Sequence, residues 1–465
     1  MYEDFIRDIR SIAERLKAEI VGGSVLLVTH YDADGLTSAA IVARALEFID
    51  VPYHIRVVDQ LDESTLTEIF TMSYDILLIT DLSLHESKVL SGDSSSKIPL
   101  TIVLDHHETT KSIKKDKIIV LNPYDYNIDG SSMVSASTMT YILAKEFNRI
   151  NERFSYLAVI GALGDRQDVG KLYTLEGLNK IAVEDATRRL LLKTEIDLRL
   201  FGLYTKPLIK CLEHSIDPYI PGLTDDENAC LSFLKSIGIP PVKNGKLRMY
   251  KDLSLEERKK LATELVKYLL SRGYSVKRAE RIFGTTYYLL KEGEKSPLYD
   301  AREFSALLNA CGRLGKESTG IALAMGFRDR ILREALDVLH EYRKLLAKTM
   351  NLVKEPDEHV RIIGKLVVAD LRDIVPPRVV GTIASLMAPL YSRFKVVVVY
   401  SGEDKLKISV RKTSIKEKDV HLGEIMRQAS LKVGGIGGGH PNAAGATIPE
   451  SEIKRFIRII HNTIK

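Results

Sequence analysis

The stretch Ser24–Gly35 reads SVLLVTHYDADG, an apolar run that ends in polar and acidic side chains. A run of this length, bounded by turn residues, is typical of a strand that is buried on both faces of a sheet. Small and apolar residues then continue at helical spacing over Leu36–Phe48. The order of strand, turn and helix predicts a βα unit.

The same kind of apolar run occurs twice more, at Asp75–Thr80 (DILLIT) and at Leu100–Leu104 (LTIVL). Apolar residues at helical spacing over 2–20 place an amphipathic helix before the first strand. Short apolar runs that alternate with helical segments favour a parallel sheet of the βαβ type. In such a sheet, ligands bind at the carboxyl ends of the strands.

Acidic or imidazole side chains follow all three predicted strands. They are His30, Asp32 and Asp34 after the first, Asp81 after the second, Asp105, His106 and His107 after the third, and a later acid, Asp165, after Gly161–Gly164. Each motif alone has an ordinary explanation, since Asp-x-Asp-Gly is common in turns and an Asp after a strand is a typical helix N-cap. Because parallel strands end at one edge of a sheet, the motifs together predict a shared crevice.

The residue types in this crevice indicate bound cations. Several carboxylates close together raise each other's pKa unless cations lie between them. Carboxylate and imidazole ligands without a thiolate suit two hexacoordinate divalent ions better than a structural zinc. Imidazole favours Mn²⁺, and Mg²⁺ is also compatible. A pair of such ions can clamp both oxygens of an in-line phosphoryl displacement, so a phosphoryl-transfer site is expected.

The rest of the chain predicts three further parts. Helical patterns cover 135–147, 156–163, 176–192 and 255–272, interrupted by the turn-rich segment 217–226 and the break Gly238-Ile239-Pro240-Pro241. A long helical stretch covers 303–350, followed by strands at 360–369, 394–400 and 406–411, a glycine-dense loop at 434–445 and a helix at 450–464. The expected domains are 1–190, a mostly helical insertion at 191–302, a connecting helix at 303–350, and a smaller α/β domain at 351–465.

Composition narrows the class of protein. Hydrophobic residues make up 45% and charged residues 28% of the 465 residues, which excludes a disordered chain. No apolar run approaches the roughly 20 residues that span a bilayer, the N-terminus lacks a signal-peptide pattern, and three cysteines are too few for a disulfide framework. We therefore expect a cytoplasmic protein without a membrane partner.

Charge is distributed unevenly along the chain. Residues 1–190 carry 20 Lys and Arg against 29 Asp and Glu, whereas 191–350 carry 28 against 21 and 351–465 carry 19 against 12. A basic second half is compatible with a polyanionic partner, and an acidic first half with bound cations. Ordinary solvated surface explains the charge counts equally well.

The motifs together resemble the DHH phosphoesterase superfamily, and within it the archaeal RecJ-like single-strand exonucleases. The resemblance rests on His30-Tyr31-Asp32-Ala33-Asp34-Gly35, Asp81, Asp105-His106-His107, Gly164-Asp165, and Gly437-Gly438-Gly439-His440-Pro441 with Asn442-Ala443-Ala444-Gly445. It covers about 1–190 and 303–465. It implies a parallel-sheet DHH domain and a C-terminal DHH-associated domain that binds substrate.

The resemblance also implies roles for the matched residues. Asp32, Asp34, Asp81, His106 and Asp165 correspond to metal ligands, with Asp81 as the bridge, and His30 is a further candidate ligand. Asp105, His106 and His107 form the catalytic motif, in which His107 either contacts the scissile phosphate or supports a ligand. Arg411, Gly437, Gly438, Gly439 and His440 correspond to phosphate-binding residues, because a guanidinium and glycine N–H groups suit phosphate oxygens. Asn309 and Arg313 are expected to line the substrate cleft, although a helix with a buried cysteine explains that segment equally well.

Three functions follow from the resemblance. The first is a metal-dependent exonuclease that cleaves single-stranded DNA or RNA from the 5′ end and releases nucleoside monophosphates. The second is a phosphodiesterase for short oligonucleotides or cyclic dinucleotides, or a 3′-to-5′ exonuclease, with the same metal site. The third is a structural component of the replication machinery that binds the GINS complex and the replicative helicase, with residues 200–300 as the docking region.

Overall fold

The computed structural model describes residues 2–84, 98–108, 116–215, 219–413 and 420–464. Residues 217 and 218 of the predicted turn-rich segment therefore lie outside the described residues. The chain divides into two compact units, one formed by residues 1–312 and 316–335 and the other by 313–315 and 336–465. Each unit is described by itself.

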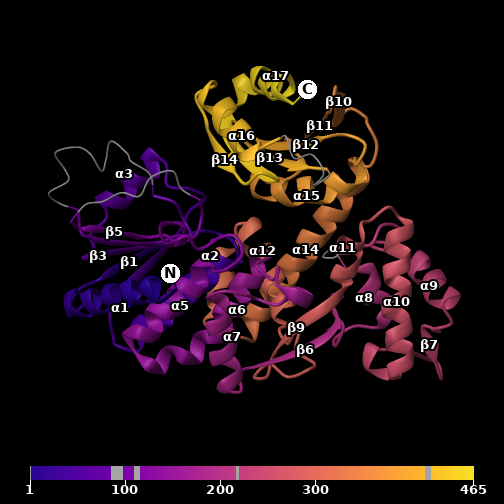
Figure 1. The fold of residues 1–465 in the computed structure, drawn as a ribbon, viewed down its shortest axis with the longest axis horizontal. Helices are drawn as coiled ribbons and strands as arrows, with labels where there is room; N and C mark the ends of the chain where they lie inside the picture. The colour runs from indigo at the N-terminus through magenta and orange to yellow at the C-terminus, as the bar shows by residue number, and fades with distance from the viewer. Residues whose placement is uncertain (1, 85–97, 109–115, 216–218, 414–419, 465) are drawn as a thin grey trace. The chain divides into compact units, whose positions relative to one another are not determined.

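A five-stranded parallel sheet forms the centre of the first unit (Figure 1). Its strand order is β2 (Tyr53–Val57), β1 (Val25–Thr29), β3 (Ile76–Thr80), β4 (Leu100–Leu104) and β5 (Ile118–Leu121). The three predicted strands are β1, β3 and β4, and every residue in them is buried. The prediction of an α/β fold with a parallel sheet is confirmed. The strands β2 and β5 were not predicted: β2 contains the polar residues His54 and Arg56, and β5 is only four residues long and partly buried.

Helices cover both faces of this sheet. They are α1 (Tyr2–Glu19), α2 (Ala33–Glu47), α3 (Glu63–Thr71), α5 (Ala136–Phe147), α6 (Ser155–Gly164) and α7 (Asn179–Arg188). Leu66 and Ile69 of α3 pack on one face, in a core with Leu26, Val28 and Leu77. The helices α1 and α5 lie on the other side of the sheet (Figure 1). Because α2 consists mainly of small and apolar residues, it packs closely against α5 and α6.

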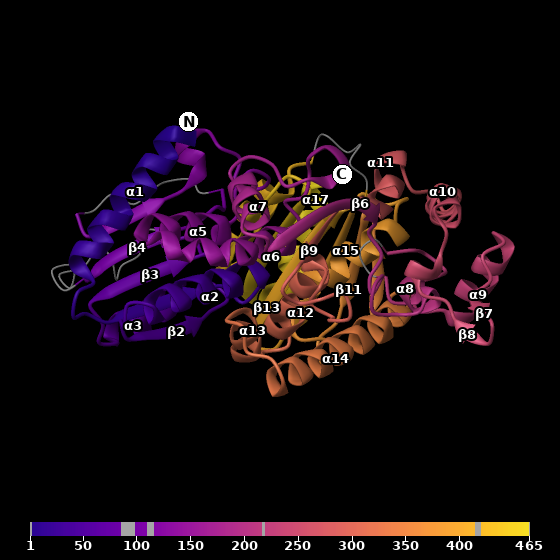
Figure 2. The ribbon, with the colours of Figure 1, turned by 90° about the horizontal axis from the view of Figure 1, so that it is seen from below.

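The insertion is helical but is joined to the rest of the unit by a β-ribbon. It contains α8 (Leu208–Glu213), α9 (Glu227–Ser236), α10 (Leu255–Ser271), α11 (Val276–Ala279) and the short pair β7 (Val242–Lys243) and β8 (Lys246–Leu247), with its own apolar core. Strands β6 (Leu192–Leu198) and β9 (Phe283–Leu289) pair antiparallel where the chain enters and leaves the insertion (Figure 2). Sequence reasoning missed this ribbon and expected helix up to residue 192, whereas α7 ends at Arg188.

The predicted connecting helix over 303–350 is divided into three. These are α12 (Ala301–Arg313), α13 (Glu317–Ala324) and the long α14 (Arg330–Leu352), labelled in Figure 2. The breaks occur where Gly315 and Gly326 adopt positive φ angles of 70° and 101°. Left-handed backbone of this kind ends a helix and is accessible to glycine at little cost.

The second unit has a six-stranded mixed sheet. Its order is β10 (Val360–Ile363), β11 (Leu366–Asp370), β12 (Val396–Gly402), β13 (Lys405–Lys412), β15 (Ala443–Pro449) and β14 (Ile436–Gly439), packed by α15 (Val380–Leu390), α16 (Leu422–Leu431) and α17 (Ile453–Thr463). The predicted strand over 360–369 is a hairpin. The predicted glycine loop is edge strand β14, a turn and the start of β15, because Gly437–Gly439 pair with Ala444–Ala446. Among the described residues, no helix combines the length and apolarity that crossing a membrane requires.

Candidate metal centre

The carboxyl edge of the parallel sheet brings the predicted ligands together. The candidate ligands form three groups, and within each group the donor atoms lie within 4.8 Å of one another. The groups are His30 with Asp32 and Asp81, Asp34 with His106 and Asp165, and Asp81 with His106 and His107. His30, Asp81 and Asp105 directly follow β1, β3 and β4. Asp32 is the N-cap of α2, and Asp165 is the residue after α6. Segments that are far apart in the sequence thus contribute to one site.

His106 lies at the centre of one group of carboxylates. Its Nε2 is 3.2 Å from Oδ2 of Asp165, 3.3 Å from Oδ1 of Asp81 and 3.8 Å from Oδ2 of Asp34. Its Nδ1 donates a hydrogen bond to the carbonyl oxygen of Gly130, at 2.7 Å. With a proton held on Nδ1, Nε2 is the nitrogen that faces the carboxylates, and in the neutral ring its lone pair could bind a metal.

Asp81 joins this group to a second one. While its Oδ1 faces His106, its Oδ2 lies 3.4 Å from Nδ1 of His30, which is also 3.0 Å from Oδ2 of Asp32. Asp81 is 2% exposed and has a positive φ of 61°. Non-glycine residues adopt this conformation at a cost and often at functional sites. Its position between two clusters suits a carboxylate that bridges two cations.

The N-termini of two helices hold the acids Asp32 and Asp34 in place. The carboxylate of Asp32 accepts the backbone N–H groups of Asp34 and Gly35 in the first turn of α2. The carboxylate of Asp34 is fully buried and accepts those of Ala136 and Ser137 in the first turn of α5. Helix N-termini stabilise negative charge there.

The electrostatics of the site favour cation binding. Burial, together with the charges of Asp81 and Asp165, raises the pKa of Asp34 to about 8. Burial also raises the pKa of Asp165 to about 6, against the opposing charge of His106. For His106 burial lowers the pKa, but the surrounding carboxylates outweigh it and raise the pKa well above the usual range. The negative charges of the carboxylates, which lie close together in this site, contribute to all three raised pKa values. A divalent cation would balance these charges better than protons do.

Buried polar atoms without partners support the same conclusion. Nδ1 of His30, Oδ2 of Asp81 and Nε2 of His106 are buried and make no hydrogen bond within the described part of the chain. Such atoms are rare in folded proteins and call for a ligand. Carboxylate oxygens and imidazole nitrogens are the donors that Mn²⁺ and Mg²⁺ sites combine. The residues present therefore fit a pair of divalent cations.

Asp105, predicted as catalytic, belongs to none of the three groups of candidate ligands. Its buried carboxylate accepts hydrogen bonds from Nδ1 of His107, at 2.8 Å, and from Oγ of Ser83, at 2.7 Å. Burial raises the pKa of Asp105, but the charge of His107 outweighs this and lowers it. His107 has a partly exposed side chain next to His106. Asp105 therefore orients His107.

Asn309, which was predicted to line the substrate cleft, lies on α12 and has a buried side chain. Its side chain is 8% exposed, accepts the backbone N–H of Ala33 at 3.1 Å and donates to the carbonyl of Gly164 at 3.4 Å. Asn309 thus ties together the start of α2, which carries Asp34, and the end of α6, which precedes Asp165. Arg313 lies in the second unit, where its guanidinium donates to the hydroxyl of Tyr342 at 3.0 Å.

The predicted phosphate-binding residues lie on neighbouring strands of the second unit. Arg411 on β13 is held by Oγ of Ser385, at 3.0 Å from Nε, and by Oγ of Ser409, at 2.8 Å from Nη1. Gly437, Gly438 and Gly439 form edge strand β14, with His440 exposed in the turn after it. No described atom lies within 4 Å of where a Cβ on Gly438 would be, so the strand has open space there.

Sequence reasoning missed the buried amides of Gln167 and Asn179. Both side chains are fully buried beside the metal site and hydrogen-bond to each other at 2.7 Å. The spacing Asp165-Arg166-Gln167 placed a polar side chain two residues after a candidate ligand, and this is a signal that could have identified Gln167.

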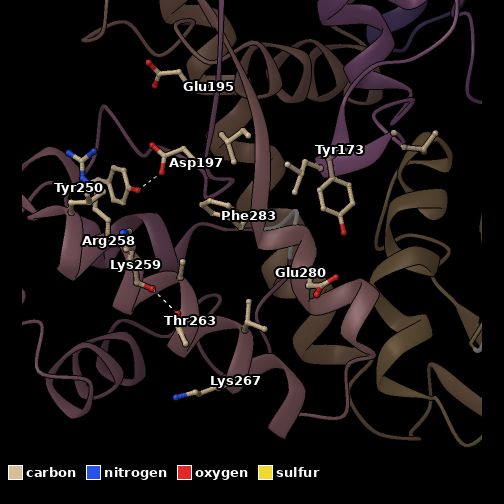
Figure 3. Close-up of a pocket in the computed structure, with 17 residues that line it drawn as sticks. Tyr173, Glu195, Asp197, Tyr250, Arg258, Lys259, Thr263, Lys267, Glu280 and Phe283 are labelled. Atoms are coloured by element: carbon tan, nitrogen blue, oxygen red, sulfur yellow. Dashed lines mark hydrogen bonds between the residues drawn. The ribbon is translucent and has the colours of Figure 1, made fainter.

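The insertion carries a separate open groove between the ribbon and α10, with a volume of about 1230 Å³ (Figure 3). Exposed apolar side chains line it, including Leu172, Ile196, Leu255 and Phe283. Glu195 and Asp197 lie on the strand side, and Arg258, Lys259 and Lys267 on the α10 side (Figure 3). The groove shares no residue with the candidate metal centre.

Three family models match the chain. The DHH family N-terminal domain matches residues 24–163, the DHH-CID domain 200–283, and the DHHA1 domain 364–465. The chain therefore contains DHH, DHH-CID and DHHA1 domains in that order. The match of the DHH-CID domain extends the resemblance into the insertion.

Among individual proteins, an uncharacterised protein of Methanocaldococcus jannaschii is 26% identical over 99% of this chain and 98% of its own length. The structure of CDC45 from Entamoeba histolytica superposes with a TM-score of 0.68 at 13% identity, covering 98% of both chains. RecJ from Thermus thermophilus in complex with Mn²⁺ superposes with a TM-score of 0.58 at 17% identity, covering 98% of this chain and 54% of RecJ. At these identities, the two structures show that the fold is shared.

Proposed function

We propose that this protein is a metal-dependent exonuclease that degrades single-stranded DNA, and also RNA, in the 5′-to-3′ direction during DNA replication or repair in the cytoplasm. The observation that carries the proposal is the convergence of Asp32, Asp34, Asp81, His106 and Asp165, with orphaned ligand atoms, at the carboxyl edge of the sheet. The DHH and DHHA1 domains and the fold shared with RecJ support it. Single-strand specificity and direction rest on the RecJ-like resemblance.

Two divalent cations, Mn²⁺ or Mg²⁺, would be held by these five residues, with His30 as a further ligand. When bound, they activate water and neutralise the phosphate charge in hydrolysis of a phosphodiester. Asp81, whose two oxygens face His30 and His106, would be shared by the two groups of ligands. RecJ structures with Mn²⁺ and with Mg²⁺ are consistent with either ion.

The remaining residues bind and orient the substrate. His107, held by Asp105, is placed to donate a hydrogen bond to a phosphate oxygen beside the site. Arg411 and the edge N–H groups of Gly437–Gly439 would bind backbone phosphates, assisted by His440. In this proposal residues 1–190 carry the chemistry, 303–350 connect, and 351–465 bind the nucleic acid without reading its sequence.

Oligonucleotides labelled at the 5′ or the 3′ end test the reaction. With Mn²⁺, we expect wild-type protein to release labelled mononucleotide at once from 5′-labelled strands, and Asp34→Asn to release none. Asp62→Asn, which removes the carboxylate of a helix N-cap at α3, is the matched control and should retain activity. Prompt release from 3′-labelled strands would instead support a 3′-to-5′ exonuclease. Cleavage restricted to dinucleotides would support the oligonucleotide or cyclic-dinucleotide phosphodiesterase, and inactivity of the wild type with either metal would overturn the proposal.

A second candidate function is docking to the replication machinery. The exposed apolar groove of the insertion and the fold shared with CDC45 favour it. In this role the groove binds the GINS complex, next to the replicative helicase. Ile196→Asp and Leu255→Asp should abolish co-purification with GINS, whereas Leu431→Asp, at an exposed leucine of the second unit, should not. Unchanged co-purification of both groove variants would reject this docking site.

A further inference from the structure

Next to the candidate metal centre lies a network of buried, hydrogen-bonded polar residues that the proposed mechanism does not use. Gln167, Asn179 and Ser135 are each 0% exposed. Groups buried so completely are kept only where their hydrogen bonds are satisfied, and here they bond to one another.

At one end, this hydrogen-bonded network contacts His106. The amide nitrogen of Gln167 donates to the carbonyl of Gly130 at 2.9 Å and to the carbonyl of Val134 at 3.2 Å. Both of its N–H groups are thus in use, and its oxygen accepts from Nδ2 of Asn179 at 2.7 Å. The orientation of the Gln167 amide is therefore fixed by three partners.

The Gly130 carbonyl, to which Gln167 also donates, determines which nitrogen of His106 carries a proton. Nδ1 of His106 lies 2.7 Å from the Gly130 carbonyl and 3.3 Å from the amide nitrogen of Gln167. Neither neighbour donates a hydrogen to Nδ1, since the carbonyl has none and the amide hydrogens point to carbonyls. Nδ1 must therefore be the donor, and Nε2 keeps its lone pair on the side of Asp81 and Asp165.

At its other end, the network leads to the residues that hold Asp34. The side-chain oxygen of Asn179 accepts the backbone N–H of Ser135 at 3.1 Å and the hydroxyl of Thr138 at 2.7 Å. Ser135 is the N-cap of α5, and the next two N–H groups of that helix are the ones that Asp34 accepts. Asn179 thus fixes the start of the helix that holds this carboxylate.

We propose that the Gln167–Asn179 pair is a positioning device that sets the tautomer of His106 and the placement of Asp34 together, so that both are ready to bind a divalent cation. This inference rests on the proposed metal site but makes its own prediction, because neither amide is a ligand. Removing a residue that hydrogen-bonds to a metal ligand typically lowers the metal affinity by about 10- to 100-fold.

The test measures Mn²⁺ binding to the full chain by electron paramagnetic resonance titration of free ion. Gln167→Met keeps the length of the side chain but removes both donors, and we expect Mn²⁺ to bind at least about 10-fold more weakly. Asn179→Asp keeps the acceptor for Ser135 but removes the donor to Gln167. It should weaken binding in the same direction, and it serves as a second variant if Gln167→Met does not fold.

The His106 tautomer gives a readout that a loss of stability alone would not change. In Mg²⁺-loaded protein with ¹⁵N-histidine, the wild type should show an Nδ1-protonated His106, assigned by comparison with His106→Asn. Gln167→Met should show a mixture of tautomers. Asn151→Leu is the matched control, because it removes a buried amide that donates to the Ala144 carbonyl and contacts no predicted ligand.

The outcomes separate the two proposals. If wild-type protein binds no Mn²⁺, the proposed function fails. If the wild type binds Mn²⁺ and both amide variants bind it equally well with an unchanged tautomer, the positioning role is refuted and the amides are only structural. Weaker binding by both variants but not by Asn151→Leu supports the inference.

Discussion

The carboxylate of Asp34 accepts the backbone N–H of Ser137 at 3.0 Å, across more than a hundred residues of sequence. This contact places an acid from the first turn of α2 against the first turn of α5. The positive end of α5 stabilises the ionised carboxylate, which burial and the neighbouring acids disfavour. Any change that separates the two helices here should therefore disturb the metal centre as well as the packing.

Gly161→Ala tests this relationship. A Cβ on Gly161 would lie 2.6 Å from Oδ1 of Asp34 and would overlap the hydroxyl of Ser137. Because overpacking of a core costs about 1–3 kcal/mol, we expect loss of stability together with a drop in nuclease activity of about 10- to 100-fold. Activity assays and chemical denaturation measure the two effects.

Gly320→Ala, on α13, is the control for Gly161→Ala. Its added methyl group would meet the flexible end of Leu36 at 2.9 Å, away from the carboxylates. It should cost stability but leave activity unchanged. Equal activity of Gly161→Ala and Gly320→Ala would show that Asp34 does not depend on the contact between α2 and α5.

Asp105→Asn separates orientation from metal binding. Asp105 holds Nδ1 of His107 at 2.8 Å and belongs to none of the three ligand groups. We expect kcat to fall by about 10- to 100-fold, since lost orientation of a group at the site has effects of that size, while Mn²⁺ affinity stays within about 2-fold. His106→Asn should lower both. Titration of Mn²⁺ alongside steady-state kinetics distinguishes the variants, and a parallel loss of Mn²⁺ affinity in Asp105→Asn would place Asp105 among the ligands.

Divalent cations should stabilise the first unit. In their absence, Asp34, Asp81 and Asp165 repel each other in a buried site. An ion that binds only the folded state stabilises it by about 2.7 kcal/mol at 100 times its Kd. Calorimetry should therefore show a higher unfolding temperature with Mn²⁺ than with EDTA. Asp34→Asn should lose most of this difference, and an unfolding temperature that Mn²⁺ does not change would argue against the site.

An ion pair in the insertion predicts how stability depends on pH. The Arg248 guanidinium hydrogen-bonds to Glu257 and lowers the pKa of that carboxyl from 4.5 to about 2. A carboxyl with a depressed pKa in the folded state contributes stability above its unfolded pKa and loses this contribution as pH falls toward the folded pKa. Glu257→Gln should therefore be less stable than the wild type at pH 7.

The difference between wild type and Glu257→Gln should shrink between about pH 4.5 and pH 2, the interval between the unfolded and folded pKa values. Because Glu257 is 30% exposed, added salt should reduce it as well. Denaturation of both proteins across this pH range provides the measurement. A constant difference down to pH 2 would show that Glu257 stabilises the insertion by packing rather than by charge.

The central sheet could be predicted from the sequence because its strands are fully buried. Continuous apolar runs identified β1, β3 and β4. Because these neighbouring strands are parallel, the polar residues that follow them lie at the same edge of the sheet. The ribbon strand β6 was missed because it alternates exposed and partly buried residues between its buried ends, and only β9, far along the chain, pairs with it. A local sequence pattern does not indicate that a strand pairs with another strand so far away along the chain.

The same distinction applies to the site. Most candidate ligands could be predicted because they follow a strand or open a helix, and Asp165 because it follows the small-residue end of α6. The contacts of Asn309 could not, since its hydrogen bonds with Ala33 and Gly164 depend on how α12 packs against the start of α2 and the end of α6. Gln167 and Asn179 were missed for this reason too, because an amide acquires its function only from the groups around it.

Arg411→Lys tests substrate binding in the second unit. The serine hydroxyls of Ser385 and Ser409 hold the guanidinium of Arg411, so its fork is oriented before any phosphate binds. A lysine keeps the charge but loses the paired donors. We expect KM for single-stranded DNA to rise by about 10-fold, the effect of losing about 1.4 kcal/mol of binding, with kcat and Mn²⁺ affinity unchanged. Lys395→Arg, a conservative exchange at a neighbouring basic position before β12, is the control and should behave as wild type. A fall in kcat at constant KM for Arg411→Lys would contradict the role in binding and would place Arg411 among the groups that act on the reacting phosphate.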